Sequence, residues 1–293
     1  MFLNLIRQLA YKGICGEITS VSKSDVSALS AEDLSVLHSV MIGPHVSLAL
    51  AMLQRIGFFE DLIPEIQEGL KLSLEKNSNG QFKDIWPHTI RVVGQAPPQL
   101  NIRWAALFHD LGKAKSYSIK NNKVTFHHHE YISARIFDQF AERTGIFSGG
   151  QRRNIHFLVA HLGYVENYDN TWSDSAVRRF DKEMGIYLED LFILSEADIT
   201  TSRPENKRRI LKRIQELKDR VTNIREKDSK QNVLPKGLGL KISKDLNIPI
   251  GKKIGEIRGY LEEMVLSGKL LPNQSHEYYI NHIKSHQMDV IVD

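Results

Sequence analysis

The chain has 293 residues, of which 41% are hydrophobic and 25% charged, so a mainly disordered protein is excluded. The single cysteine, Cys15, rules out an internal disulfide and fits a reducing compartment. The longest uncharged apolar stretch, near residues 46–53, is far too short to cross a membrane, and the N-terminus lacks the features of a signal peptide. We therefore expect a cytoplasmic protein without a membrane partner.

The net charge of +4 is concentrated in one part of the chain. Residues 203–230 contain eleven Lys and Arg against five Asp and Glu, which leaves the remainder slightly acidic. This local surplus suggests where an RNA or nucleotide phosphate could bind, but for a single basic amphipathic stretch a solvated helix face is the simpler interpretation.

Helical patterns dominate the N-terminal part. Apolar residues at positions 2, 5, 6 and 9 indicate a helix face, and Pro44 and Gly57 bracket a helix whose apolar residues begin at Val46. A second pattern over residues 59–74 is interrupted at Pro64, and a loop follows at residues 77–80.

Residues 82–204 read as a run of helices with one small hairpin, formed by residues 115–119 and 123–126. Residues 204–227 predict one long amphipathic helix. After a connector at residues 232–239, a final helix begins near Gly251 and ends before Gly268. The sequence thus predicts an all-α fold in three parts: an N-terminal helical body (1–80), a central domain (81–204), and a basic helix with a C-terminal helical tail (205–293).

Five short segments of the central part carry imidazole and carboxylate groups, the side chains that hold borderline divalent metals. They are Trp86-Pro87-His88-Thr89, Leu107-Phe108-His109-Asp110-Leu111-Gly112-Lys113, Phe126-His127-His128-His129-Glu130, Val159-Ala160-His161 and Glu196-Ala197-Asp198.

The adjacent pair His109 and Asp110 follows an apolar helical run, and burying both is costly unless a cation satisfies their lone pairs. His88 lies 21 positions before His109, so these ligands must converge from different helices. For any one of these residues taken alone, a role as an ordinary surface or core residue is a simpler interpretation than a role as a metal ligand. Six further histidines are assigned to that simpler role: His38, His45, His156, His276, His282 and His286.

The ordered series of segments resembles the HD superfamily of metal-dependent phosphohydrolases. It is most similar to the HD domain, helical body and tail of bacterial tRNA nucleotidyltransferases and poly(A) polymerases, over roughly residues 35–275. The segment Phe126-x-x-His129-Glu130-x-x-Ser133-Ala134 follows that subgroup's pattern, apart from a serine where glycine is common, and it favours His129 over His127 and His128. Nothing in residues 1–35 supplies the Gly-Gly/Ser turn and Asp-x-Asp pair of the nucleotidyltransferase head, so we expect that the chain does not add nucleotides alone.

The resemblance implies a metal site built from six residues. Four of them would hold one divalent ion, and the other two complete the pattern of relatives with two ions, with Asp110 as the bridging carboxylate and a catalytic residue. Mn, Fe, Co, Ni or Zn suits this shell, and Mg suits it less well. The four are His88, His109, Asp110 and Asp198, and the two are His129 and His161.

Two further residues near the site have open roles. Lys113 is either a catalytic residue that neutralises a phosphate oxygen or a solvated lysine after a glycine. Glu130 either orients His129 or is a surface glutamate. Five basic residues are candidates for binding phosphate or RNA: Arg203, Lys207, Arg208, Lys252 and Lys253.

Two functions compete at this stage. The first is hydrolysis of phosphate esters of nucleotides or RNA, as a phosphatase or a 2′,3′-cyclic phosphodiesterase. The second is an RNA-binding, non-polymerising subunit of a split nucleotidyltransferase whose head is a separate partner chain. A structural metal with no activity is a third reading.

Overall fold

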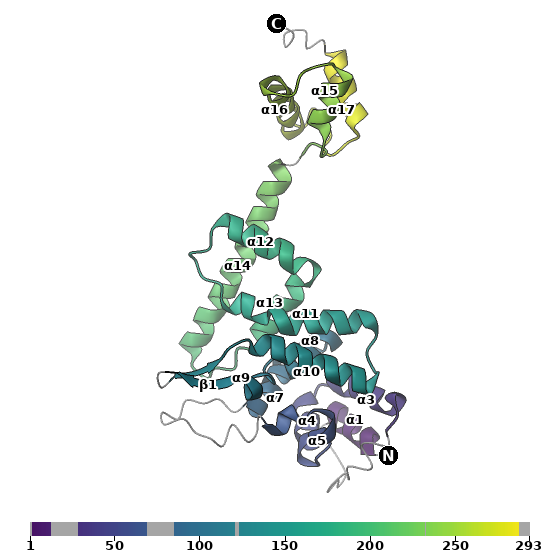
Figure 1. Cartoon of the computed structure of the whole chain (residues 1–293), viewed down its shortest axis with the longest axis vertical. Coiled ribbons are helices and arrows are strands. Elements are labelled where there is room, and N and C mark those ends of the chain that lie inside the picture. Colours follow the sequence, from purple (N-terminus) through teal and green to yellow (C-terminus); the bar gives the residue numbers. More distant parts are fainter. Residues whose placement is uncertain (1, 13–28, 69–84, 121–122, 232, 287–293) are drawn as a thin grey trace. The chain divides into compact units, whose positions relative to one another are not determined.

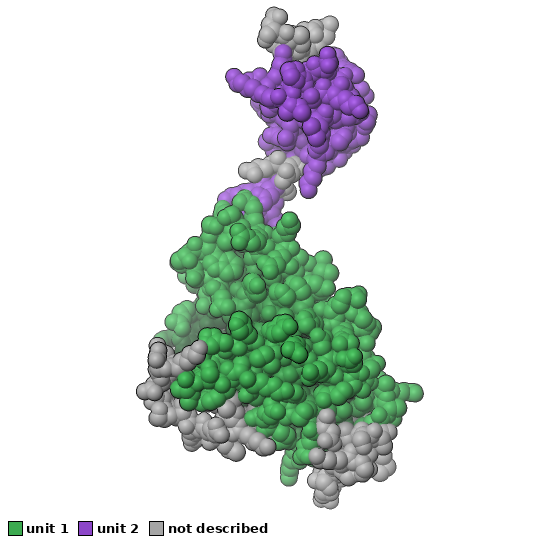
Figure 2. Space-filling model, in the orientation of Figure 1, with its two compact units in different colours: residues 1–217 green, residues 218–293 purple. Residues whose placement is uncertain are grey.

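The computed structural model describes residues 2–12, 29–68, 85–120, 123–231 and 233–286. They form two compact units, residues 1–217 and 218–293 (Figure 2). The predicted boundary at residue 80 and the predicted 77–80 loop lie outside the described residues, as do Cys15 and the turn at residues 121–122. The three-part division of the chain therefore stays a prediction.

The first unit is almost entirely helical (Figure 1). Its N-terminal helices are α1 (Phe2–Lys12), α3 (Ala31–Ile42), α4 (Val46–Arg55) and α5 (Phe59–Leu62). The helices that follow are α7 (Ile85–Gln95), α8 (Leu100–Phe108), α9 (Lys113–Ser116), α10 (His129–Thr144), α11 (Gly149–Glu166), α12 (Asp174–Met184), α13 (Leu188–Ala197) and the beginning of α14 (Pro204–Gln231), with a 3-10 turn at Gly185–Tyr187. Among the described helices, none has both the length and the apolar character that a membrane crossing requires.

The two strands form an antiparallel hairpin, β1 (Tyr117–Lys120) and β2 (Lys123–Phe126), in which Tyr117 lies opposite Phe126. The first strand begins two residues later than predicted, because residues 115 and 116 belong to the short helix α9. The all-α fold class and the hairpin were predicted from the sequence pattern. Helix α10 begins shortly after the end of β2.

Helix α8 lies at the centre of the core, against α7, α11 and α13. Every residue from Ile102 to its end is buried. The Trp104 ring contacts Phe108, Phe140 and Phe147 at centroid separations of 5.1–6.3 Å. Because α8 is packed on all sides, the residues that follow its C-terminus have little freedom to move.

Arg103 is a buried cation that binds backbone carbonyls. Its Nη1 donates to the carbonyls of Met41 (2.7 Å) and Gly43 (2.8 Å), and its Nε donates to that of Ala96 (3.1 Å). These carbonyls belong to the C-terminal ends of α3 and α7, where the helix dipole is negative. Burial lowers the pKa of Arg103. The sequence gives no signal for this residue, because its partners are remote segments.

The second unit contains the end of α14, then α15 (Leu238–Asp245), α16 (Lys252–Leu266) and α17 (His276–Ser285). Its helices enclose a core of their own that includes Ile242, Ile257, Leu261 and Tyr279. The sequence-based expectation that the helix after Gly251 is the last one was wrong. Helix α17 follows it, begins at the N-cap Ser275 and buries Tyr279 in that core.

Replacing Arg103 with methionine should destabilise the protein by about 3 kcal/mol, because the buried carbonyls lose their donors. Urea unfolding followed by circular dichroism measures the change. The exposed Arg55 gives the matched control, since Arg55→Met should shift stability by less than about 0.5 kcal/mol. Equal effects at the two positions would contradict this role of Arg103.

Candidate metal centre

Three elements of the first unit bring four predicted ligands together. His88 lies on α7, His109 is the C-cap residue of α8 and Asp110 follows it, and Asp198 is the C-cap residue of α13. His109 and Asp110 are each 3% exposed. Packing of α7 and α13 against α8 thus places side chains from distant parts of the sequence in one buried cluster.

The donor atoms of this cluster lie close to one another. Nε2 of His88 is 3.3 Å from Nε2 of His109 and 2.9 Å from Oδ1 of Asp198. Oδ2 of Asp110 is 3.4 Å from each of the two imidazole nitrogens, and Oδ1 of Asp198 is 3.3 Å from His109. Ligands about 2.0–2.2 Å from one metal ion are about 3.0–3.5 Å apart. The separations therefore fit a shared divalent ion.

Hydrogen bonds on the far side of each ring orient the histidines. A backbone carbonyl only accepts, so the Nδ1 atoms of His109 and His129 carry a proton, and in the neutral rings the Nε2 atoms present lone pairs. The Nε2 atoms of His109 and His88 point at each other and at the carboxylates of Asp110 and Asp198. A cation stabilises such an arrangement. The Nδ1 contacts are Ala106 O for His109 (2.7 Å), Phe126 O for His129 (3.0 Å) and Thr200 Oγ1 for His88 (2.9 Å).

The pKa shifts of His109, Asp110 and Asp198 also indicate that positive charge stabilises this cluster. Burial alone would lower the pKa of His109, but the Asp110 and Asp198 carboxylates raise it well above its ordinary value. Burial alone would raise the pKa values of Asp110 and Asp198, but His109 lowers both. Lys113 also lowers the pKa of Asp110, and His88 also lowers the pKa of Asp198. Both carboxylates are thus ionised at neutral pH, and they attract a cation.

His129 approaches this cluster from the start of α10. Its Nε2 is 3.6 Å from Oδ1 of Asp110, the carboxylate oxygen on the side away from His88. Oε2 of Glu130 is 3.2 Å from Nδ1 of His129, and the orienting role of Glu130 stays a prediction. His127 and His128 are exposed.

His161 does not join the cluster through any contact recorded among the described residues. Its Nδ1 donates to the carbonyl of Phe157 (2.8 Å), and its ring is stacked between Phe157 and Tyr164. Its other nitrogen keeps the lone pair that a ligand needs. The role of His161 as a sixth ligand therefore stays a prediction.

Lys113 is bound to the cluster rather than solvated. Its Nζ is 2.6 Å from Oδ2 of Asp110 and lies 5.8 Å from the centre of the Phe126 ring. Burial alone would lower the pKa of Lys113, but Asp110 raises it. The lysine therefore carries a fixed positive charge next to the candidate metal ligands.

Helix α7 also holds the segment that carries Asp198. Gln95 Nε2 donates to the carbonyls of Ala197 (2.6 Å) and Ile199 (3.3 Å), which flank Asp198 in the chain. Arg91 donates to the carbonyl of Thr200 (3.3 Å), whose hydroxyl contacts His88. His88, Arg91 and Gln95 lie on one face of α7, because they are separated by three and then four residues. Sequence reasoning missed both Thr200 and Gln95. The helical spacing from His88 is a signal that could have identified Gln95.

Gly112 allows the metal-binding turn to contact α10 closely. A Cβ atom at this position would lie 2.7 Å from the backbone nitrogen of Ser133 and would also collide with the carbonyl oxygen of His129. The Gly112 amide donates to the Ser133 hydroxyl (2.8 Å). Asp110 and His129 are thereby held side by side.

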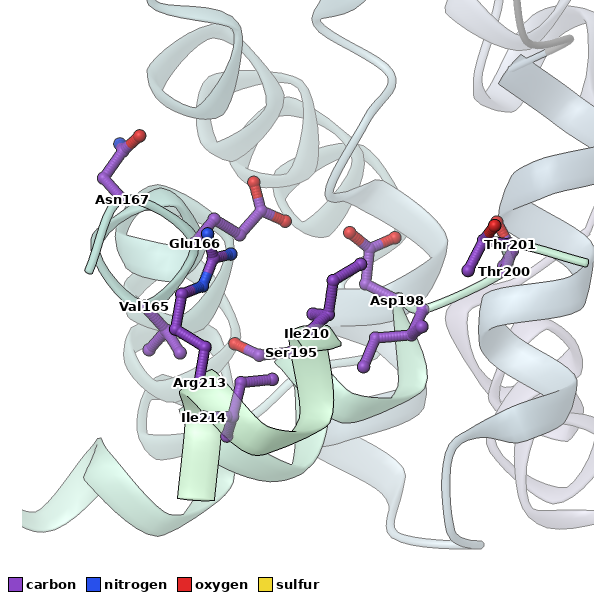
Figure 3. A pocket seen from close by; sticks show the side chains of 11 residues that line it. Val165, Glu166, Asn167, Ser195, Asp198, Thr200, Thr201, Ile210, Arg213 and Ile214 are labelled. Carbon is purple, nitrogen blue, oxygen red and sulfur yellow. The ribbon is translucent and has the colours of Figure 1, made fainter. Parts of the chain in front are cut away.

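A pocket of about 350 Å³ opens beside Asp198 (Figure 3). Glu166, at the end of α11, also lines this pocket, and its carboxyl group lies near that of Asp198. Part of Glu166 is open to the pocket, but the surrounding protein desolvates its carboxyl group and, with Asp198 nearby, raises its pKa to about 8. Sequence reasoning missed Glu166, because no motif contains it.

The five predicted phosphate- or RNA-binding residues lie outside this cluster. Arg203, Lys207 and Arg208 are exposed around the start of α14. Lys252 begins α16 and forms an exposed ion pair with Glu256 at 3.6 Å, next to the half-buried Lys253. Their binding role stays a prediction.

Comparison with known proteins agrees with this geometry. Residues 88–223 match the family model of the HD domain, whose superfamily contains metal-dependent phosphohydrolases. The A-adding tRNA nucleotidyltransferase of Deinococcus radiodurans is 25% identical over 176 residues, and this match covers 57% of the chain. The chain spans only 38% of the length of that relative. The HD domain is thus related to that of a tRNA nucleotidyltransferase.

Thr200→Val should lower the affinity for Mn²⁺ about 10- to 100-fold, because His88 loses the partner that fixes its ring. Metal titration calorimetry of chelator-treated protein measures the affinity. Thr222→Val on α14 makes the same chemical change at an exposed site and should leave affinity unchanged. If Thr200→Val bound Mn²⁺ like the unmodified protein, the orienting role of Thr200 would be wrong.

Gly112→Ala should destabilise the protein by about 1–3 kcal/mol and weaken metal binding, because the added methyl group pushes α10 away from Asp110. The control is Gly255→Ala on α16, where a Cβ atom meets nothing within 4 Å. That substitution should stabilise the protein by about 0.5–1 kcal/mol through helix propensity. Thermal unfolding with and without Mn²⁺ distinguishes the two, and destabilisation by both variants would show that packing at Gly112 is not special.

Proposed function

We propose that this chain, through its HD domain, is a metal-dependent phosphohydrolase acting on phosphate esters of nucleotides or RNA. The observation that carries the proposal is the cluster of His88, His109, Asp110 and Asp198, whose lone pairs converge beside a pocket open to solvent. Neutral imidazoles with two ionised carboxylates suit Mn²⁺, Fe²⁺, Co²⁺, Ni²⁺ or Zn²⁺.

The four residues would hold one ion, with His129 and His161 as candidate ligands of a second. An ion bound there lowers the pKa of a coordinated water and stabilises negative charge on phosphate oxygens. The Lys113 ammonium group, fixed by Asp110, adds a positive charge where a phosphate would enter. Thr200, Gln95 and Glu130 keep the ligands oriented before the substrate arrives.

A second candidate is an RNA-binding subunit that works with a separate nucleotidyltransferase head. The match to an A-adding tRNA nucleotidyltransferase favours it, together with the basic residues of 203–230. In that case RNA affinity should fall steeply as salt concentration rises, because bound cations are released from the phosphates.

Hydrolysis is tested on a panel of phosphomonoesters, nucleotides and 2′,3′-cyclic nucleotides, with chelator-treated protein reloaded with single metals. We expect metal-dependent turnover that Asp110→Asn abolishes, because this substitution removes a charged oxygen from the centre of the cluster. The matched control is Asp190→Asn near the start of α13, which should retain full activity.

Metal-loaded protein that hydrolyses nothing on the panel would contradict the phosphohydrolase proposal. Salt-sensitive RNA binding by the same preparation would then support the subunit alternative. Turnover that persists in Asp110→Asn would show that the cluster is not the catalytic site.

A further inference from the structure

The pocket beside Asp198 has an apolar wall and a polar wall. Val165, Ile199, Ile210 and Ile214 supply hydrocarbon surface. The polar groups come from α11, α13, the segment after Asp198, and α14: Glu166, Asn167, Ser195, Thr200, Thr201 and Arg213. Seven of the eleven lining residues have polar side chains and four have hydrocarbon side chains. The volume of the pocket falls within the range of small-molecule sites.

Arg213 is the one basic side chain in the described lining of this pocket. Its Nε is buried and has no hydrogen-bond partner within the part of the chain that the structure describes. Asp169 lies near enough for the Arg213 charge to help lower its pKa, but Asp169 Oδ1 accepts hydrogen bonds from Thr171. Among the residues that the structure describes, no ion pair joins the Arg213 guanidinium group to a carboxylate in the paired geometry that arginine usually adopts.

The two charged ends of the pocket are separated. In Figure 3, Asp198 and Arg213 lie on opposite sides of Ile210, whose side chain projects between them. A phosphate held at the metal cluster would therefore leave Arg213 free to bind a different part of the same molecule. The apolar wall would contact the carbon skeleton that joins the two parts.

We propose that Arg213 binds a second phosphate of the substrate, so that the site prefers a small organic bisphosphate to a monophosphate. This inference rests on the proposed phosphohydrolase function and adds its substrate class. A guanidinium group binds phosphate through two parallel hydrogen bonds, which lysine does not reproduce. Arg213 is a specificity-determining residue in this view and takes no part in bond cleavage.

The test measures the affinity of the Mn²⁺-loaded full chain for adenosine 3′,5′-bisphosphate and for adenosine 5′-monophosphate by calorimetry. The bisphosphate should bind about 10- to 100-fold more tightly, the effect expected of hydrogen bonds to a charged group. Arg213→Gln should remove this preference and leave monophosphate binding unchanged, and Arg213→Lys should keep part of it. Thermal unfolding checks that each variant is folded.

Lys212→Gln is the matched control, because it removes one positive charge from the neighbouring residue of α14. The Lys212 side chain is 79% exposed and pairs with Glu216, so the bisphosphate preference should survive. Equal affinities of the unmodified protein for the two nucleotides, or an Arg213→Gln variant that keeps the preference, would overturn the inference. A preference that depends on Arg213 in a protein that hydrolyses neither nucleotide would contradict the phosphohydrolase proposal but not the role of Arg213.

Discussion

The candidate site of the first unit depends on one electrostatic constraint: Asp110 is buried, and Asp198 partly buried, beside the Nε2 atoms of two histidines. Two ionised carboxylates inside a helical core are strongly unfavourable unless positive charge compensates them. Lys113 supplies one charge at 2.6 Å from Asp110, and a raised pKa lets His109 supply a second by holding a proton. A divalent ion at the same place satisfies the cluster more completely, because it accepts all the lone pairs at once.

Much of the surrounding fold can be understood as support for that cluster. Helix α8 is buried along its length and ends in His109, so its packing fixes the metal-binding turn. Helix α7 places His88 and Gln95 on one face, and Gln95 fastens the backbone on both sides of Asp198. Gly112 lets α10 contact the turn without a side chain between them, which brings His129 to Asp110.

The sequence predicted both the local and the distant candidate ligands of this site, and His88 and Asp198 came from the ordered series of segments and its family resemblance. His109, Asp110 and Gly112 are adjacent in the chain, and the apolar run before them indicates a buried helix end. The all-α class and the long helix α14 follow from helical periodicity in the same way. The sequence did not reveal Glu166, Thr200 or Arg103, because their partners lie far away in the chain and no spacing rule connects them. Helix α17 was missed for another reason: the Pro, Asn and Gly residues before it resemble the end of a domain.

The distribution of the site along the chain bears on how the two candidate functions relate. All predicted metal ligands, Lys113 and the lining of the pocket fall within residues 1–217, whereas the core of the second unit is separate. The residues proposed to bind RNA include Arg208, in the first unit, and Lys252, in the second. The two proposals thus involve different residues, and each can be tested by substitutions that leave the residues of the other unchanged.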